Sequence, residues 1–544
     1  MFAESAKDQN RCSNVNHVLN LEAWEEALSD HPDNLFRNYI IDGIINGVNI
    51  GYSGQSSNII CKNWPSANKY HDAVEDIIRQ DVIRGRKVGP FHTPPEQFVG
   101  SPLGAFEKKH TPGKYRVIHD LSWPPGHSVN EQITEDCSVH YVTIDDIVSQ
   151  VKSFGVKGVK MSKLDLENAY KHIFVRPEDR HLLGITWDTM NSNAVPKREF
   201  YMDTTLPFGL KSSAKHFTLY ADGLQYAMKK NGVSIVSHYL DDYFTCGHPD
   251  SMECEANLAI MNYTCKQLGF GVQPSKMVYA TTELEYIGIT IDSVAMELRI
   301  SETRLREIRE DLLRWRGKHQ CTKRELLSLI GKLSFICKVV KSGRTFLRRL
   351  IDESKRAKYR ISLSFAVQKD IEWWLEYLPS WNGISVIYDD MWSTNVDLHL
   401  WTESSDVAIG AYFGQEWFCE PFTGLTESYK CMSIAWRELY AIVKAVATWC
   451  HHLKGKMVLF HCDNEAVCHI IQSGTSSDPA IMSLVRALFF MSAGHDFVCS
   501  AVHVRGCHNE AADALSRCMI QRFRQLIPEA NQFPSSLGHI PINL

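Results

Sequence analysis

Two adjacent carboxylates, Asp241 and Asp242, interrupt a hydrophobic run that has the composition of a buried β-strand. The run spans Ser234 to Gly247 and reads SIVSHYLDDYFTCG. Like charges side by side in apolar surroundings repel each other and lose hydration, so few folds tolerate them. A solvated surface hairpin without further function is the favoured reading of the pair alone. The alternative is a divalent cation, because hard oxygen ligands near sheet ends hold Mg²⁺.

A third acidic position, Asp165, follows a strand-like run from Val159 to Leu164 and precedes a turn into helix. If this strand neighbours the hairpin that carries the acidic pair, three carboxylates converge. Two Mg²⁺ ions would relieve their repulsion. Such two-metal sites activate an attacking hydroxyl and stabilise the leaving oxygen in phosphoryl transfer.

The C-terminal part of the chain presents a second spaced set of acids. Glu403 follows a strand in LHLWTESSDVAIGAYF, and Glu438 lies beside the buried stripe of the amphipathic helix SIAWRELYAIVKAVATW. Asp463 ends the buried strand of KMVLFHCDNEAV, and VHVRGCHNEAADALSR supplies His503 and Asp513. Each acid alone is a solvated cap or turn residue, but together the four acids predict a two-metal cluster.

Length and composition limit the possible classes of protein. The 544 residues suggest roughly three or four domains, and 44% hydrophobic with 22% charged residues is ordinary for globular protein. No apolar run approaches the ~18 residues of a membrane span, and the polar N-terminus lacks a signal-peptide core. The 16 cysteines contain no C-x₂-C pair, which favours reduced thiols in an intracellular compartment.

Charge is distributed unevenly along the chain. The net charge is −5, yet the segment from Arg304 to Arg360 holds 18 Lys or Arg against 6 Asp or Glu. Such a block is typical of a surface that binds phosphate backbones, whereas a solvated helical face is the plainer interpretation. Apolar residues at helical spacing indicate packed helices with one basic side; these are Leu326, Leu327, Leu329, Ile330, Leu333 and Ile336.

The order of the motifs resembles that of reverse transcriptases. KLDLENAY, LPFGLKSSA and HYLDDYF follow one another, with KYRVIHDLS before them and QPSKMVY and LEYIGITI after them. GSPLGAF, SVNEQI and LIGKLSFICKVVKSGRTFLRRL are most similar to DIRS-like elements, the tyrosine-recombinase retrotransposons related to LTR retroelements, and HPDNLFRNYIIDGIINGVNIGY extends the match towards the N-terminus. The C-terminal segment resembles RNase H.

This resemblance implies an α+β fold, in which a right-hand polymerase precedes a connector and an α/β RNase H-like domain. We expect a largely helical N-terminal extension (1–87), fingers and palm (88–295) and a basic helical thumb (296–360). A connector (361–395), the RNase H-like domain (396–520) and a C-terminal tail (521–544) follow.

For the polymerase metals, the resemblance implies Asp165 and Asp241 as main Mg²⁺ ligands. Asp242 would be a weaker ligand, and the backbone carbonyl of Leu166 would complete one metal shell. Since neighbouring side chains on a strand point to opposite faces, a tight hairpin is needed to keep two Asp near one site. Glu167 and Asn168 stand where retroviral relatives often have Gly and Asp, but the turn backbone matters more than its side chains.

For the nucleotide, the resemblance implies that Tyr170 is a steric gate against a 2′-hydroxyl. Phe208 and Gly209 would line the base and sugar pocket.

Lys109 and Arg116 match fingers residues that hold the triphosphate, and Lys276 is a candidate acid for the departing pyrophosphate. For each cation, a solvated surface charge is the plainer alternative.

For the nuclease, the resemblance implies Glu403, Glu438, Asp463 and Asp513 as metal ligands and His503 as an aid to product release. The family has Asp at the first position, so Glu403 is a departure. An extra methylene moves a carboxylate by about 1 Å, an error that can cost ~10²-fold in rate.

The resulting hypothesis is an RNA-directed DNA polymerase with RNase H activity. It would use Mg²⁺, with Mn²⁺ as a substitute, and bind an RNA template, a DNA primer, their hybrid and dNTPs, but no membrane. DIRS-like relatives would imply an element-encoded capsid protein and recombinase, cytoplasmic particles and nuclear access. Three alternatives stay open: an inactive RNA- or hybrid-binding descendant, an RNA-dependent RNA polymerase, and a polymerase whose nuclease is impaired by Glu403.

Overall fold

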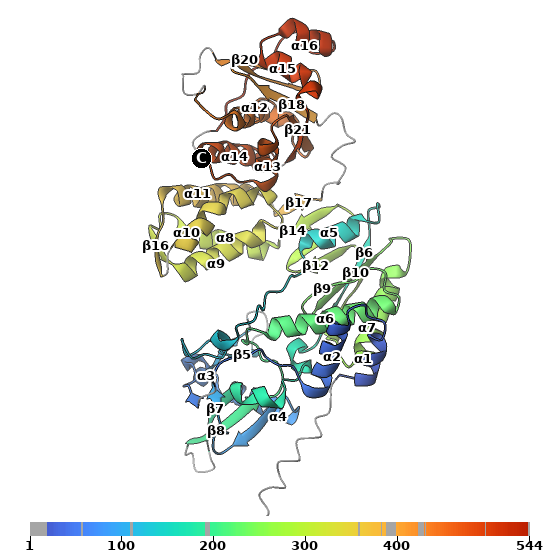
Figure 1. The fold of residues 1–544 in the computed structure, drawn as a ribbon, viewed down its shortest axis with the longest axis vertical. Helices are drawn as coiled ribbons and strands as arrows, with labels where there is room; N and C mark the ends of the chain where they lie inside the picture. Colours follow the sequence, from blue (N-terminus) through green and yellow to red (C-terminus); the bar gives the residue numbers. More distant parts are fainter. Residues whose placement is uncertain are drawn as a thin grey trace, which may run out of the picture. The chain divides into compact units, whose positions relative to one another are not determined.

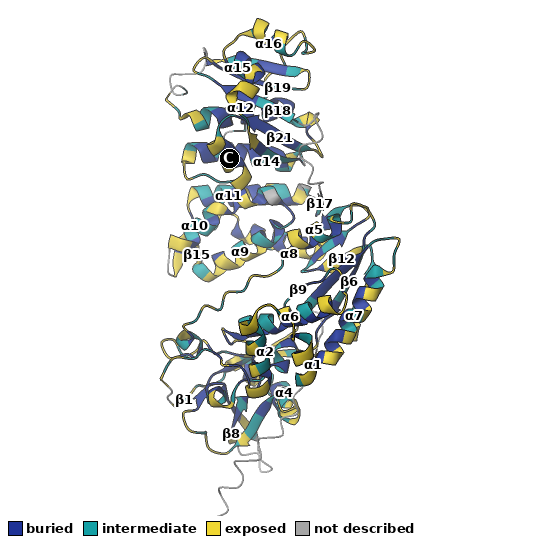
Figure 2. Ribbon diagram, turned by 45° about the vertical axis from the view of Figure 1, so that its right-hand side comes forward, coloured by how far each residue is buried: buried dark blue, intermediate teal, exposed yellow. Residues whose placement is uncertain are grey.

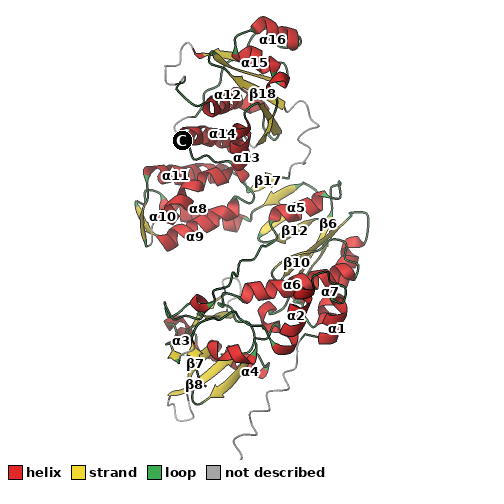
Figure 3. Cartoon of the chain, in the orientation of Figure 1, coloured by secondary structure: helices red, strands yellow, loops and turns green. Residues whose placement is uncertain are grey.

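A computed structural model describes most of the chain: residues 19–55, 58–108, 113–190, 196–356, 359–381, 383–387, 399–422, 429, 431–495 and 497–541. The chain divides into two compact units, Met1–Ile287 and Gly288–Leu544, and each is described by itself (Figure 1). Helices and strands are mixed in both units, which confirms the α+β class (Figure 3). No described helix is both long and apolar enough to cross a membrane.

The first unit begins with four helices. These helices are α1 (Leu21–Ala27), α2 (Asn34–Asn46), α3 (Pro65–Lys69) and α4 (His71–Ile83). The side chain of Asn20 caps α1, and that of Asp33 caps α2. Trp24 on α1 is fully buried and packs against the rings of Tyr220 and Phe270 at centroid distances of 6.0 and 6.2 Å. Helices α1 and α2 are therefore part of the hydrophobic core that supports the acidic pair, whereas α3 and α4 belong to a smaller core of the same unit.

A four-stranded sheet carries the predicted acidic positions of this unit. Its order is β11 (Val278–Thr281), β6 (Lys160–Asp165), β10 (Asp242–Gly247) and β9 (Ser237–Tyr239). Helix α7 (Glu253–Leu268) packs against β6 and β10, and α6 (Ser213–Lys230) packs against α7. Leu164 and Tyr243, which pair across β6 and β10, are fully buried. Apolar side chains on both strands thus anchor the sheet end where the acids lie.

The remaining strands of the first unit form a second sheet and a hairpin. The sheet has the order β1 (Ile59–Ile60), β3 (Val99–Gly100), β7 (Gly184–Met190), β8 (Pro196–Asp203) and β2 (Lys87–Phe91). The hairpin pairs β4 (Leu103–Glu107) with β5 (Tyr115–His119). Helix α5 (Ile144–Lys152) and strand β12 (Glu283–Tyr286) complete the unit. Lys87 forms a buried ion pair with Asp203, which His119 also contacts, so the base of the hairpin is tied to the sheet.

The second unit starts with helices that carry the basic block. They are α8 (Glu302–Trp315), α9 (Lys323–Ile336), α10 (Arg348–Arg356) and α11 (Phe365–Ser380). A ribbon of β15 (Gln320–Thr322) and β16 (Arg360–Ser362) lies between them in sequence, and β13 (Ile289–Asp292), β14 (Glu297–Arg299) and β17 (Ile384–Val386) form a small sheet. The prediction of packed helices is confirmed. Four of the predicted apolar positions are buried, whereas Leu327 is 48% exposed because it faces away from the other helices' core.

A five-stranded sheet organises the rest of the second unit. Its order is β20 (Glu416–Pro421), β19 (Ala408–Phe413), β18 (His399–Ser404), β21 (Met457–Cys462) and β22 (Val498–His503). Five helices accompany it: α12 (Ile434–Trp449), α13 (Glu465–Ser473), α14 (Pro479–Gly494), α15 (Glu510–Ser516) and α16 (Ile520–Leu526). Both α12 and α15 pack against β18 and β19. The strand–helix–strand–helix order predicted for the four acids is therefore present.

The segment after α16 folds back onto this sheet and its helices (Figure 2). The backbone carbonyl of Asn531 accepts a hydrogen bond from the Trp417 indole at 2.7 Å, and the N–H of Gly538 donates to Thr448. Ile540 is buried in the core that contains α12. The end of the segment predicted as a polar tail is thus part of the folded unit, because a few apolar and hydrogen-bonding residues are sufficient to hold it.

Two candidate carboxylate sites

The hairpin of β9 and β10 places the acidic pair beside Asp165. Asp242 is the register partner of Asp165 across β10 and β6, and the N–H of Leu166 donates to the carbonyl of Asp241 at 3.0 Å. Leu240, in the turn, has a left-handed φ of +53°, which lets the chain reverse directly before the acids. The predicted neighbouring strands and the tight hairpin are both confirmed.

Burial raises the pKa of two of these carboxyl groups. The pKa of Asp241 rises through burial and the charge of Asp165. That of Asp242 rises to about 6, mainly through burial and contact with Asp165, and the charge of Lys163 opposes the shift. One oxygen of Asp242 is buried with no hydrogen-bond partner in the described part of the chain. A crowded set of hard oxygen donors with spare lone pairs fits Mg²⁺.

Lys276 lies at this cluster, at the end of a short 3₁₀ turn. Its Nζ donates to both carboxylate oxygens of Asp165, at 2.8 and 2.9 Å. Burial lowers the pKa of Lys276, but the hydrogen bond to Asp165 and the negative charges of the three acids together outweigh burial and leave the pKa raised. An ammonium group at this position is available to a phosphate-bearing ligand, whereas its predicted role as an acid stays a prediction.

The residues predicted to bind the nucleotide are two aromatic side chains and a glycine. Tyr170 lies in a 3₁₀ turn (Ala169–His172), with its ring centroid 5.0 Å from Phe208 and 5.3 Å from Phe217. Gly209 has φ +113°, and a Cβ there would overlap the backbone carbonyl of His119. Tyr170, Phe208 and Gly209 are therefore close together, as the predicted pocket requires.

Of the two fingers cations predicted to bind the triphosphate, the structure describes one. Arg116 is exposed on β5, and its charge slightly opposes the rise in the pKa of Asp241 that burial causes. Lys109 lies outside the described residues. Leu166 is buried, and the role of its carbonyl stays a prediction.

Two tyrosines beside the acids were not among the predicted site residues. Tyr239 directly precedes the hairpin turn, and its ring centroid lies 5.1 Å from that of Tyr141. Burial raises the pKa of Tyr170 to about 12, and the charges of Tyr141, Asp241 and Tyr239 act in the same direction. The sequence position of Tyr239, two residues before Asp241, could have indicated that it lies at the site. Nothing in the sequence around Tyr141 indicated the same.

In the second unit, Glu403 and Glu438 share one backbone donor. The N–H of Ser404 donates to Glu403 at 3.2 Å and to Glu438 at 3.1 Å, and the amide of Asn509 donates to Glu403 at 2.9 Å. Burial, followed by the charges of Glu403 and Asp463, raises the pKa of Glu438 to about 10. The longer side chain of Glu403 thus still reaches the acid on α12.

Asp463 joins this pair directly after β21. Donor atoms of Glu438, Cys462 and Asp463 all lie within 4.8 Å of one another. The Nε2 of His503 lies 3.1 Å from the backbone carbonyl of Asp463. Cys462 was not predicted as a site residue, although it directly precedes Asp463.

Asp513 lies in α15, which packs against the Glu403 strand. Its carboxylate accepts hydrogen bonds from Arg517, four residues later, at 2.8 and 3.0 Å. In the described contacts, Glu403, Glu438 and Asp463 lie together, whereas Asp513 is paired with Arg517.

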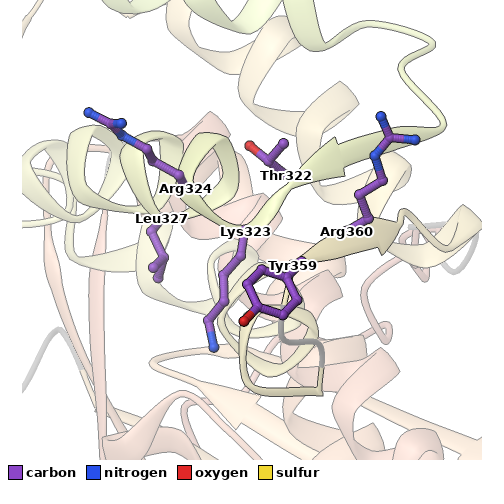
Figure 4. A pocket seen from close by; sticks show the side chains of 6 residues that line it. All are labelled: Thr322, Lys323, Arg324, Leu327, Tyr359 and Arg360. Atoms are coloured by element: carbon purple, nitrogen blue, oxygen red, sulfur yellow. The ribbon is translucent and has the colours of Figure 1, made fainter. Parts of the chain in front are cut away.

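The basic helices contain a pocket of about 600 Å³ at the start of α9. It is lined by Thr322, Lys323, Arg324, Leu327, Tyr359 and Arg360 (Figure 4). Three of these six residues are cationic, none is acidic, and Tyr359 is 83% exposed. Exposed cations with an aromatic ring are typical of surfaces that bind nucleic acid.

Comparisons with known proteins agree with the first site. Residues 107–291 match the family model described as reverse transcriptase (RNA-dependent DNA polymerase), so the chain carries a reverse transcriptase domain over this range. This range contains all three acids of the first site.

The chain is also similar to retrotransposon polyproteins. The Tf2-3 and Tf2-7 polyproteins of Schizosaccharomyces pombe are each 22% identical over 372 residues, covering 65% of this chain. The match spans only a quarter of each relative's length. Among solved structures, a foamy viral protease-reverse transcriptase in complex with dsDNA is 14% identical, with a TM-score of 0.48 over 89% of this chain and 97% of that one.

Proposed function

We propose that this chain is the RNA-directed DNA polymerase of a retroelement, with an RNase H activity in its second unit. The pairing of Asp165 with Asp242, next to Asp241 and inside the reverse transcriptase domain, carries the proposal. Residues 88–295 would then form fingers and palm, residues 296–360 the thumb, and residues 396–520 the nuclease domain.

The polymerase site would hold two divalent cations, Mg²⁺ by preference. Asp165 and Asp241 would be the main ligands, Asp242 a weaker one, and the carbonyl of Leu166 would complete a shell. Bound there, the cations would activate the primer hydroxyl and neutralise charge on the departing pyrophosphate. The buried, partnerless oxygen of Asp242 supports this assignment, because an unpaired carboxylate in that position is otherwise costly.

The neighbouring side chains would select and orient the nucleotide. The ring of Tyr170, fixed between Phe208 and Phe217, would exclude a 2′-hydroxyl from the sugar pocket. The absence of a side chain at Gly209 would let the sugar and base approach the backbone.

Three cations would bind the triphosphate: Arg116, Lys109 and Lys276. Lys276 would also donate a proton to pyrophosphate, since its ammonium already lies at the acidic cluster.

The nuclease proposal rests on Glu403, Glu438 and Asp463, with Asp513 and His503 as further members. The contact of Ser404 with both glutamates supports it despite the Glu403 departure. A carboxyl group as buried as that of Glu438, beside two other acids, requires a proton or a cation, and two Mg²⁺ fit the oxygen donors.

The partners would be an RNA template, a DNA primer and their hybrid. The basic helices and the pocket at Tyr359 would contact the duplex backbone, so binding should fall steeply with salt and depend little on sequence. We further propose a DIRS-like element, supported by the motifs quoted above; a capsid protein and a tyrosine recombinase would then be element-encoded partners.

Primer extension on a labelled RNA template with Mg²⁺ and dNTPs tests both activities. Wild type should extend the primer and shorten the label, and Asp241→Ala should lose extension but keep label cleavage on a preformed hybrid. The matched control is Asp250→Ala, since Asp250 is an exposed acid of the same unit. It should behave as wild type.

The other readings predict different outcomes. Salt-sensitive hybrid binding without extension by any variant would favour an inactive binding protein. Extension with NTPs in preference to dNTPs would favour an RNA-dependent RNA polymerase. Extension without label shortening would leave a polymerase whose nuclease is impaired by Glu403.

A further inference from the structure

A thiol lies inside the carboxylate cluster of the second unit. Cys462, the last residue of β21, is fully buried, and its Sγ lies 4.0 Å from a carboxylate oxygen of Glu438. Donor atoms of Cys462, Glu438 and Asp463 lie within 4.8 Å of one another, the spacing at which one cation can contact all three. Asp463 is only partly buried, so the cluster has a route to solvent.

A second observation at this cluster also points to a cation. Asn509 is 1% exposed and donates to Glu403 through its amide nitrogen, yet its side-chain oxygen has no hydrogen-bond partner among the described residues. No ion pair with a lysine or arginine is found for Glu403, Glu438 or Asp463 in the described part of the chain. Two buried glutamates and a partly buried aspartate without a cationic partner, together with a partnerless oxygen on the side chain that donates to Glu403, are the surroundings a metal ion would complete.

We propose that Cys462, Glu438 and Asp463 form a binding site for a thiophilic divalent cation, Zn²⁺ or Cd²⁺. Sulfur ligands select such ions, whereas Mg²⁺ prefers oxygen. Binding replaces the S–H bond by a metal–sulfur bond, and the thiol proton passes to the solvent. Water supplies the remaining position of a tetrahedral shell.

Metal binding at this site would affect RNA cleavage. This effect rests on the proposed nuclease function, whereas the metal site itself does not. A zinc ion on Cys462 occupies two carboxylates that Mg²⁺ needs, so it inhibits RNA cleavage. Among the described residues, the group of close metal-binding side chains that includes a thiol is the one at Glu438 and Asp463, so extension is spared at the same zinc concentration.

The test is a Cd²⁺ titration of the full chain, followed by the ultraviolet sulfur-to-cadmium charge-transfer band in the presence of a competing chelator. Cys462→Ser should lose the part of this band that comes from tightly bound Cd²⁺. Its Cd²⁺ affinity should fall by at least about tenfold, because removal of even a residue that only hydrogen-bonds to a metal ligand costs about that much. The matched control is Cys431→Ser, because Cys431 is an exposed cysteine of the same unit. It should retain the band.

The outcomes separate this proposal from the nuclease. Loss of the tight band in Cys462→Ser supports the metal site even if no variant cleaves RNA. An unchanged tight band overturns it even if cleavage is normal. Where Cys462→Ser fails to fold, X-ray absorption of wild type loaded with one Zn²⁺ decides: a sulfur at about 2.3 Å supports the site, and an all-oxygen shell refutes it.

Discussion

Gly209 offers the sharpest test of how the first unit forms its nucleotide pocket. It follows Phe208 in the loop before α6, and its φ of +113° is unfavourable for any residue with a Cβ. A Cβ would meet the backbone carbonyl of His119 well inside the 3.0 Å that real Cβ atoms respect. Because backbone cannot rotate away as a flexible side chain can, Gly209→Ala must displace the loop, the end of β5, or both.

The structure sets the scale of the effect. A residue forced into such a backbone conformation costs about 1–3 kcal/mol. Relief of the overlap also requires a shift of about 1 Å in the loop that carries Phe208, and an error of that size at a reacting centre costs ~10²-fold. We therefore expect kcat/KM for dNTP incorporation to fall by about 10²-fold, equivalent to about 2.7 kcal/mol.

A second glycine serves as the control, because it separates the effect of backbone strain from that of loop displacement. Gly232 has a similar φ of +101°, but nothing lies within 4 Å of a Cβ built there. Gly232→Ala should lower the Tm of the first unit by about 2–4 °C per kcal/mol of strain and leave dNTP kinetics within twofold of wild type. Single-nucleotide extension and thermal melting of both variants measure this. If Gly209→Ala extends primers with wild-type kinetics, or if Gly232→Ala loses activity equally, the close approach of Gly209 to His119 does not shape the pocket.

Three further predictions follow from individual contacts. Asp370 is buried and forms ion pairs with Arg349 at 3.0 Å and with the buried Arg486 at 3.3 Å, so Asp370→Ala should destabilise the second unit by about 3–5 kcal/mol, measured by denaturant unfolding; a cost below 1 kcal/mol would contradict this. Tyr170→Ala should raise the NTP:dNTP incorporation ratio by at least tenfold, since the ring would no longer meet the 2′-hydroxyl; an unchanged ratio argues against a gate. Glu403→Ala should abolish cleavage of a preformed hybrid and leave extension within twofold, whereas retained cleavage would remove Glu403 from the site.

The sequence was sufficient to predict the main features of the first site. Short, mostly apolar runs predicted the strands beside Asp165 and the acidic pair, and two acids in a buried hairpin allowed few arrangements, so the pairing of Asp165 with Asp242 could be expected. The overlap at Gly209 could not, because it depends on His119, 90 residues earlier in the chain and brought close by the tertiary fold.

The second site was harder to predict in detail. Its acids follow recognisable strands and helices, yet nothing in the local pattern indicates that Cys462 turns towards Glu438. A buried cysteine usually behaves as a small apolar residue, so its presence among acids emerges only from packing. The packing of the segment after α16 could likewise not be predicted, since Gly538 hydrogen-bonds to, and Ile540 packs against, residues far away in sequence.

The two sites accommodate crowded carboxylates differently, and pH separates them. Lys163 and Lys276 lie near the first set, and the pKa of Asp242 rises only to about 6. The second set has no such cation in its described surroundings, and the pKa of Glu438 rises to about 10. Each raised pKa means that protonation stabilises the metal-free fold below the ordinary pKa, and that this stabilisation is lost as pH rises through the folded value.

At pH 7, therefore, Asp242 is already mostly ionised, whereas Glu438 still carries a proton that Mg²⁺ must displace. Mg²⁺ affinity of the second site should rise about tenfold per pH unit between pH 7 and 9, with release of nearly one proton, while that of the first site stays flat. Calorimetry in buffers of different ionisation enthalpy measures this release, with Asp241→Ala and Glu438→Gln isolating each site. Equal proton release from both sites would mean that Lys163 and Lys276 do not account for the difference between them.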